Sequence, residues 1–194
     1  MERTAITSLR DGPAITLGLL GLVSGVLSAT VGMDYAPSWL KPIGSIFFLE
    51  GSSVPIGAFY GIAVGVGVAL WAGRAWAVPV LMVTTMVAWS AAINTAIPIQ
   101  GTTGTNASLV RTLAAGLAAG AVGAGITHLG ASVFAAALRQ PLRIVLTVAV
   151  GTVCGLLYFL GDREVVPAWS LYVIWQPAVA FTIGLGLARR SVNS

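Results

Sequence analysis

The residues with the most chemistry lie in the last apolar stretch, SLYVIWQPAVAFTIG, which carries Gln176 and Pro177 in its middle. A proline inside a helix cannot donate a backbone hydrogen bond, and its ring displaces the carbonyl four residues earlier, here that of Val173. Gln176 adds two hydrogen-bond donors and one acceptor at the same depth. Because hydrocarbon satisfies none of these groups, the pair must face protein, water or a ligand.

We predict a ligand-binding set of neutral polar and aromatic residues from this stretch and from one earlier apolar stretch. Tyr172 lies one helical turn before Gln176 on the same face, and Thr84 and Thr85 are expected at a matching depth. Such a site suits a small uncharged or weakly polar solute. The predicted set is Gln176, Tyr172, Trp175, Thr84, Thr85, Ser90 and Asn94.

A structural interpretation of Gln176 stays open beside the functional one. Polar side chains often bridge neighbouring membrane helices, and each such hydrogen bond is worth about 0.6 kcal/mol on average. On this interpretation the amide bonds a neighbouring helix next to a proline kink, and no ligand is involved.

Charged chemistry is missing from the apolar stretches, since none of them contains Asp, Glu or Lys. Proton relays and ion pathways usually depend on such groups. We interpret the single cysteine, Cys154, as an inert buried thiol and the single histidine, His128, as a hydrated group near the membrane surface. The sequence has no GxSxG, HExxH or Walker A pattern. We therefore predict a non-enzymatic protein without catalytic residues, metal or cofactor.

The composition indicates which elements must position these residues. Of the 194 residues 57% are hydrophobic and only 8% are charged, whereas a soluble domain carries about 25% charged residues. Six stretches have the roughly 20 apolar residues that a membrane-spanning helix needs. We predict an all-α, polytopic membrane helix bundle, a single domain over residues 1–194 surrounded by the lipid bilayer. The six predicted spans are Ala14–Val31, Val54–Trp71, Trp76–Ile97, Leu109–Leu129, Leu142–Leu160 and Val166–Leu187.

The basic residues predict the orientation of the bundle. Seven of them flank one side of the predicted spans and three flank the other, and the richer side is normally cytoplasmic. Both termini are therefore predicted in the cytoplasm, for a multi-pass protein of a bacterial inner membrane. Because no basic stripe with interleaved aromatic residues is present, we predict no nucleic-acid partner. The two groups are Arg3, Arg10, Arg74, Arg139, Arg143, Arg189 and Arg190 on one side, and Lys41, Arg111 and Arg163 on the other.

The chain has 24 glycines, which let membrane helices approach closely where lipid removes the hydrophobic driving force. Gly57, Gly61 and Gly65 form a double GxxxG ridge, a glycine zipper, on one predicted span. This ridge either packs within the monomer or docks another membrane subunit or a second copy of the chain. The similar segments GRAWAVP and GDREVVP also predict an inverted repeat of three spans each, over 1–97 and 109–188.

Two functions fit this sequence. The first is a small-solute transport or binding component that uses the neutral site around Gln176. The second is an accessory or assembly subunit of a larger membrane protein complex, which docks through its glycine-rich helix faces.

Overall fold

A computed structural model describes residues 2–30, 53–101 and 108–188 of the chain, with side chains from residue 12 onward except at 53 and 54. These residues form helices and turns, and no strand occurs among them. Six helices are long and apolar enough to cross a membrane, with α6 and α7 counted as one, which confirms the predicted all-α membrane bundle. The elements are α1 (Glu2–Thr30), α3 (Ser53–Ala72), α4 (Ala77–Gln100), α5 (Leu109–Ser132), η3 (Ala136–Arg139), α6 (Pro141–Cys154), α7 (Leu156–Asp162) and α8 (Ser170–Leu187).

The last two predicted spans differ from the observed helices at their ends. The fifth span is divided at Gly155 into α6 and α7. The sixth begins at Ser170 instead of Val166, because the chain turns after α7: Glu164 has a positive φ of 56°, and the amides of Val165 and Val166 both bond the carbonyl of Leu160. Gln176 is nevertheless within about one helical turn of the middle of α8.

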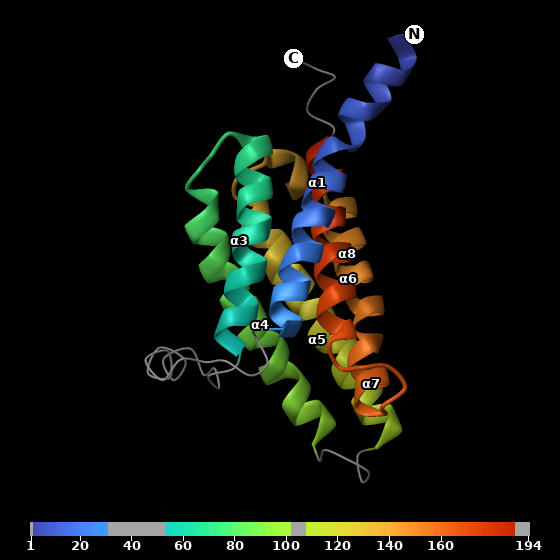
Figure 1. Cartoon of the computed structure of the whole chain (residues 1–194). Helices are drawn as coiled ribbons and strands as arrows, with labels where there is room; N and C mark the ends of the chain where they lie inside the picture. The colour runs from blue at the N-terminus through green and yellow to red at the C-terminus, as the bar shows by residue number, and fades with distance from the viewer. Residues whose placement is uncertain (1, 31–52, 102–107, 189–194) are drawn as a thin grey trace.

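The spanning helices form a closed ring in chain order. Helix α1 packs on α3, then α4, α5 and α6 follow, and α8 packs between α6 and α1. The first residues of α1 and the last residues of α8 lie at the same end of the bundle (Figure 1). We call this the terminal end, and the opposite end the loop end. The predicted inverted repeat over 1–97 and 109–188 stays a prediction.

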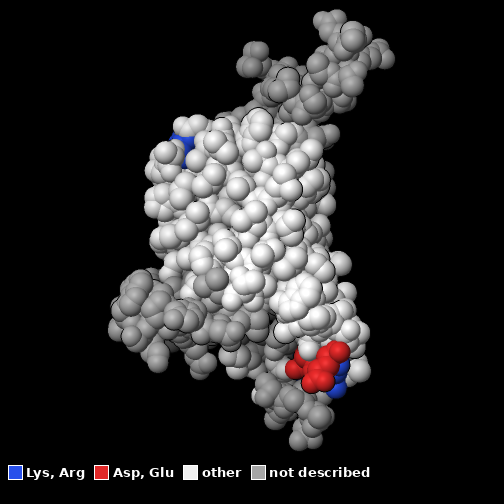
Figure 2. Space-filling view, viewed as in Figure 1, with Lys and Arg blue, Asp and Glu red and all other residues white. Residues whose placement is uncertain are grey.

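Charged side chains lie at the two ends of the bundle. Figure 2 shows an uncharged belt between them on one face, as expected for a surface that meets acyl chains. Arg74 and Arg139 belong to connections at the terminal end, whereas Asp162 and Arg163 lie in the turn at the loop end. The cytoplasmic orientation of the termini stays a prediction. Of the basic residues on which this prediction rests, Lys41, Arg189 and Arg190 lie outside the described residues, as do the side chains of Arg3 and Arg10.

Glycines bring the helix backbones together at several joints of the ring. Between α5 and α6, a Cβ atom added at Gly116 would lie 2.5 Å from the carbonyl oxygen of Gly155. Between α1 and α8, a Cβ added at Gly25 would lie 2.6 Å from the carbonyl oxygen of Tyr172. No side chain fits at such distances, so glycine is required at these positions.

The GxxxG ridge of α3 packs within the chain. A Cβ atom at Gly57 would lie 2.7 Å from the Cα of Met86, and one at Gly65 would lie 2.6 Å from the Cα of Val78. Gly61 faces the backbone of Met82 in the same way. A partner that used this ridge would have to displace α4.

The prediction that His128 is hydrated is wrong, because its side chain is fully buried. Its Nδ1 lies 2.8 Å from the hydroxyl of Thr147 on α6, and its Nε2 lies 2.8 Å from the carbonyl oxygen of Leu138 on η3. The connection after α5 folds inward with Leu138 buried, and this excludes water from the histidine. Cys154, predicted as a buried thiol, is half-buried at the end of α6.

The glycine joint between α5 and α6 predicts position-specific effects of adding a methyl group. Gly120→Ala would place its Cβ against the carbonyl oxygen of Gly151, so the helices must separate, and we expect a loss of about 1–3 kcal/mol in the free energy of unfolding. Gly125→Ala on the same helix is the control, because its Cβ would meet only a methyl of Val148 at an ordinary 3.6 Å. Unfolding in mixed micelles measures both variants, and equal stability of the two would contradict this account of the joint.

Candidate functional site

A cavity of about 270 Å³ lies inside the ring of helices. Its lining residues come from α3, α4, α5 and α8, together with Gly155 and Tyr158. On α3 and α8 they belong to the first residues of each helix, such as Ile56 and Leu171, and on α4 they extend from Thr85 to Ala96. Because α4 runs in the opposite direction to α3 and α8, these positions place the cavity from mid-depth toward the loop end.

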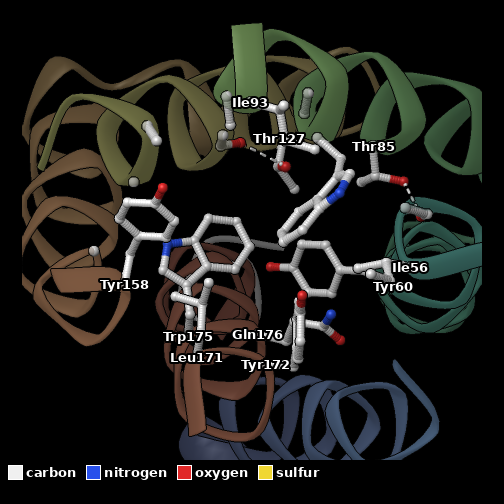
Figure 3. Close-up of a pocket in the computed structure, with 18 of the residues that line it drawn as sticks. Ile56, Tyr60, Thr85, Ile93, Thr127, Tyr158, Leu171, Tyr172, Trp175 and Gln176 are labelled. Atoms are coloured by element: carbon white, nitrogen blue, oxygen red, sulfur yellow. Dashed lines mark hydrogen bonds between the residues drawn. The ribbon is translucent and has the colours of Figure 1, made fainter. Parts of the chain in front are cut away.

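Aromatic side chains form the walls of the cavity. The ring of Tyr60 on α3 meets that of Trp175 on α8 edge to face, with centroids 5.5 Å apart. The ring of Trp89 on α4 meets that of Tyr172 on α8 at 5.6 Å with a tilt of 44°. Figure 3 shows Tyr60, Trp175 and Tyr158 entering the space from different helices. Two aromatic pairs therefore enclose one space between α3, α4 and α8.

Small residues of α4 and α5 leave the space that the aromatic rings do not fill. Ala88, Ala92 and Ala96 recur every four residues and so share one face of α4. On α5, Gly123 lies beneath the indole of Trp175, where an added Cβ would lie 3.3 Å from Cζ2. The cavity thus exists because bulky side chains of α8 oppose residues with little or no side chain.

Gln176 is fully buried, and its amide bonds the neighbouring helix α1. Its Oε1 accepts a hydrogen bond of 2.6 Å from the hydroxyl of Ser24, and its Nε2 donates one of 3.0 Å to the hydroxyl of Ser28. Pro177 lies inside α8, which continues to Leu187, and its Cα would be 2.7 Å from a Cβ added at Gly21. The Gln-Pro pair therefore joins α8 to α1, as the structural interpretation expected, although Gln176 also lines the cavity.

The other predicted site residues are only partly brought together. Tyr172, Trp175 and Thr85 line the cavity with Gln176. The hydroxyl of Thr85 is engaged, since it donates to the carbonyl of Gly57 on α3 at 2.7 Å (Figure 3).

Thr84, Ser90 and Asn94 lie outside the cavity lining. Thr84 bonds the carbonyl of Val80 in its own helix and packs beside Gly130 of α5. Asn94 is exposed on the outside of the bundle and donates to the carbonyl of Ser90 at 2.9 Å. An amide can thus face outward when a carbonyl one turn back in its own helix provides the partner.

Sequence reasoning missed several residues that build the cavity. Tyr60 and Trp89 each supply one ring of the two aromatic pairs, and Tyr158 donates a short hydrogen bond to Gln100 at the loop end of the cavity. A usable signal was present, because Tyr60 and Trp89 are aromatic residues in the interior of spans, whereas Trp71 and Trp76 sit at span ends. No signal identified Ser24 and Ser28 as the partners of Gln176.

The arrangement is chemically neutral. All residues that line the cavity among the described part of the chain are uncharged, so it offers aromatic contact and a few polar atoms. No family model, curated protein or solved structure matches the chain. The site must therefore be interpreted from its own geometry.

The bonds of Gln176 to α1 predict a structural cost when its amide is removed. Gln176→Leu deletes both links to Ser24 and Ser28, and we expect a loss of about 1–2 kcal/mol in the free energy of unfolding. Asn94→Leu is the matched control, because that amide bonds only its own helix, and its loss should stay below about 0.5 kcal/mol. Unfolding in mixed micelles compares them. A wild-type stability for Gln176→Leu would contradict the structural role.

Proposed function

We propose that this protein is a non-enzymatic membrane component that binds a small uncharged solute inside its helix bundle, as part of its transport or handling. The observation that carries the proposal is the aromatic-walled cavity of about 270 Å³ between α3, α4, α5 and α8. Ligand sites are typically concave and mainly apolar, with a few convergent polar groups.

The electrostatics of the cavity support a neutral ligand. A charged solute would lose its hydration there without gaining an opposite charge from the lining residues. Aromatic edges and faces offer directional contacts that lipid acyl chains lack, so a solute that fits gains by leaving the bilayer. The same neutrality argues against a proton-coupled step through these residues.

The position of the cavity supports access from one side. It lies toward the loop end, which the positive-inside rule assigns to the outside of the cell. Toward the terminal end the ring is filled by buried side chains such as Leu81, Leu138 and Ile183. A solute that crosses the protein would need these residues to move, and an energy-driven step would need a partner protein.

An accessory-subunit role, predicted as the alternative, has less support. The glycine ridge of α3 that it would use is packed on α4.

Filling the cavity should abolish solute binding. Ala92 is nearly buried and lines the cavity, so the phenyl group of Ala92→Phe would occupy the space available to a ligand. Val87 lies on the same helix, is 40% exposed and does not line the cavity, which makes Val87→Phe the control. After purification in mild detergent, native mass spectrometry and solvent extraction should find a small molecule on the wild type and on Val87→Phe, but not on Ala92→Phe.

Two results would count against the proposal. One is the same small molecule retained by Ala92→Phe at the wild-type level. The other is a protein-sized adduct without any small molecule, which would favour the accessory-subunit role.

A further inference from the structure

We propose that the solute is a neutral, mainly apolar molecule with an acceptor oxygen, such as a ketone or ester carbonyl, which receives hydrogen bonds from Trp89 and Tyr60. This inference rests on the proposed function and narrows its ligand class. It is carried by two polar atoms at the cavity that have no hydrogen-bond partner among the described residues, Tyr60 Oη and Trp89 Nε1.

The hydroxyl of Tyr60 is the first of these atoms. The Tyr60 side chain is only 3% exposed, so water does not reach it freely. Figure 3 shows its hydroxyl directed from α3 into the space between the helices, toward Trp175. The ring is held in place by its edge-to-face contact with Trp175. A buried hydroxyl in a low-dielectric site is costly unless a bond is made, so this group favours a ligand that bonds it.

The indole N–H of Trp89 is the second atom, and it decides the chemistry. An indole nitrogen donates only, so its partner must be an acceptor. The Trp89 ring packs on Tyr172 and lines the same cavity as Tyr60. A carbonyl oxygen has two lone pairs and can receive both the indole N–H and the Tyr60 hydroxyl.

Five other polar side chains that line the cavity already have partners within the chain. The indole N–H of Trp175 donates to the carbonyl of Gly151 at 3.2 Å, and the hydroxyl of Thr127 donates to that of Gly123 at 2.8 Å. Thr85, Gln176 and Tyr158 are likewise bonded. The chain therefore satisfies these groups but leaves Tyr60 and Trp89 available for a ligand.

A cationic ligand fits these observations less well. Aromatic walls do bind quaternary ammonium groups through cation–π attraction. Such a cation has no acceptor atom, however, and would leave the Trp89 N–H buried without a partner. A neutral ligand with an acceptor oxygen can bond the Trp89 N–H and the Tyr60 hydroxyl, and it keeps the aromatic contacts.

Two probes of the same shape test this inference. Acetophenone carries a carbonyl oxygen where α-methylstyrene carries a methylene group. Their dissociation constants follow from the rise in unfolding temperature of the purified protein with probe concentration. We expect the wild type to bind acetophenone about tenfold more tightly than α-methylstyrene, the value of one net buried hydrogen bond. Trp89→Phe and Tyr60→Phe should each reduce this preference at least about threefold.

The comparison between proteins removes the effect of the micelles. Each probe partitions into detergent equally for every variant, so the change in preference reports the protein alone. Trp76→Phe is the control, because Trp76 packs on Phe134, is 50% exposed and does not line the cavity. Without probe, Tyr60→Phe should be as stable as the wild type or more so, since it removes an unpaired hydroxyl. Tyr60→Phe therefore still tests the acceptor-oxygen inference if Trp89→Phe does not fold.

The two proposals fail in different ways. If Ala92→Phe weakens neither probe, the cavity is not the binding site and the proposed function falls. If Ala92→Phe weakens both probes but Trp89→Phe and Tyr60→Phe keep the wild-type preference for acetophenone, only the acceptor-oxygen inference is overturned.

Discussion

The structure depends on one constraint: a polar group inside hydrocarbon must find its partner within the protein. Most polar links observed between the described helices join neighbours in the ring, although Tyr158 of α7 bonds Gln100 of α4 across α5. Gln176 joins α8 to the serines of α1, Thr85 joins α4 to a carbonyl of α3, and His128 joins α5 to α6 and η3. The indole of Trp175 joins α8 to the backbone of α6. These links fix which helix lies beside which, a choice that apolar surfaces alone would specify weakly because lipid is as apolar as leucine.

Close backbone packing and the central cavity are two results of the same distribution of side-chain volume. Glycines allow α1 to approach α8, and α5 to approach α6, at distances that exclude any side chain. Where α4 and α5 present alanine and glycine opposite the aromatic rings of α3 and α8, these small residues leave a space between the helices. Tyr60 and Trp89 border that space with unpaired polar atoms, so the general rule of internal satisfaction is relaxed at the site where we propose a ligand.

Sequence reasoning correctly predicted that Gln176 is shielded from lipid, but it did not predict which neighbours the polar residues contact. Gln176 had to be buried because lipid cannot solvate an amide, and it is buried. The hydration of His128 was inferred from its position near a span end, but the following connection folds over it. Asn94 was expected in a site, yet its partner is a carbonyl of its own helix. A linear sequence does not show whether a polar residue finds its partner locally, on another helix or in a ligand.

The sequence by itself determined that lipid surrounds the chain, that six apolar helices span it, and that neutral polar groups lie at mid-depth. It could do so because length, hydropathy and the cost of burying polar atoms are properties of each segment alone. Only the tertiary structure decided the closed order of the ring, the serine partners of Gln176 and the pairing of Tyr60 with Trp175. Those features depend on which helix faces are brought together, and this is set by side-chain volumes on both helices of a contact at once.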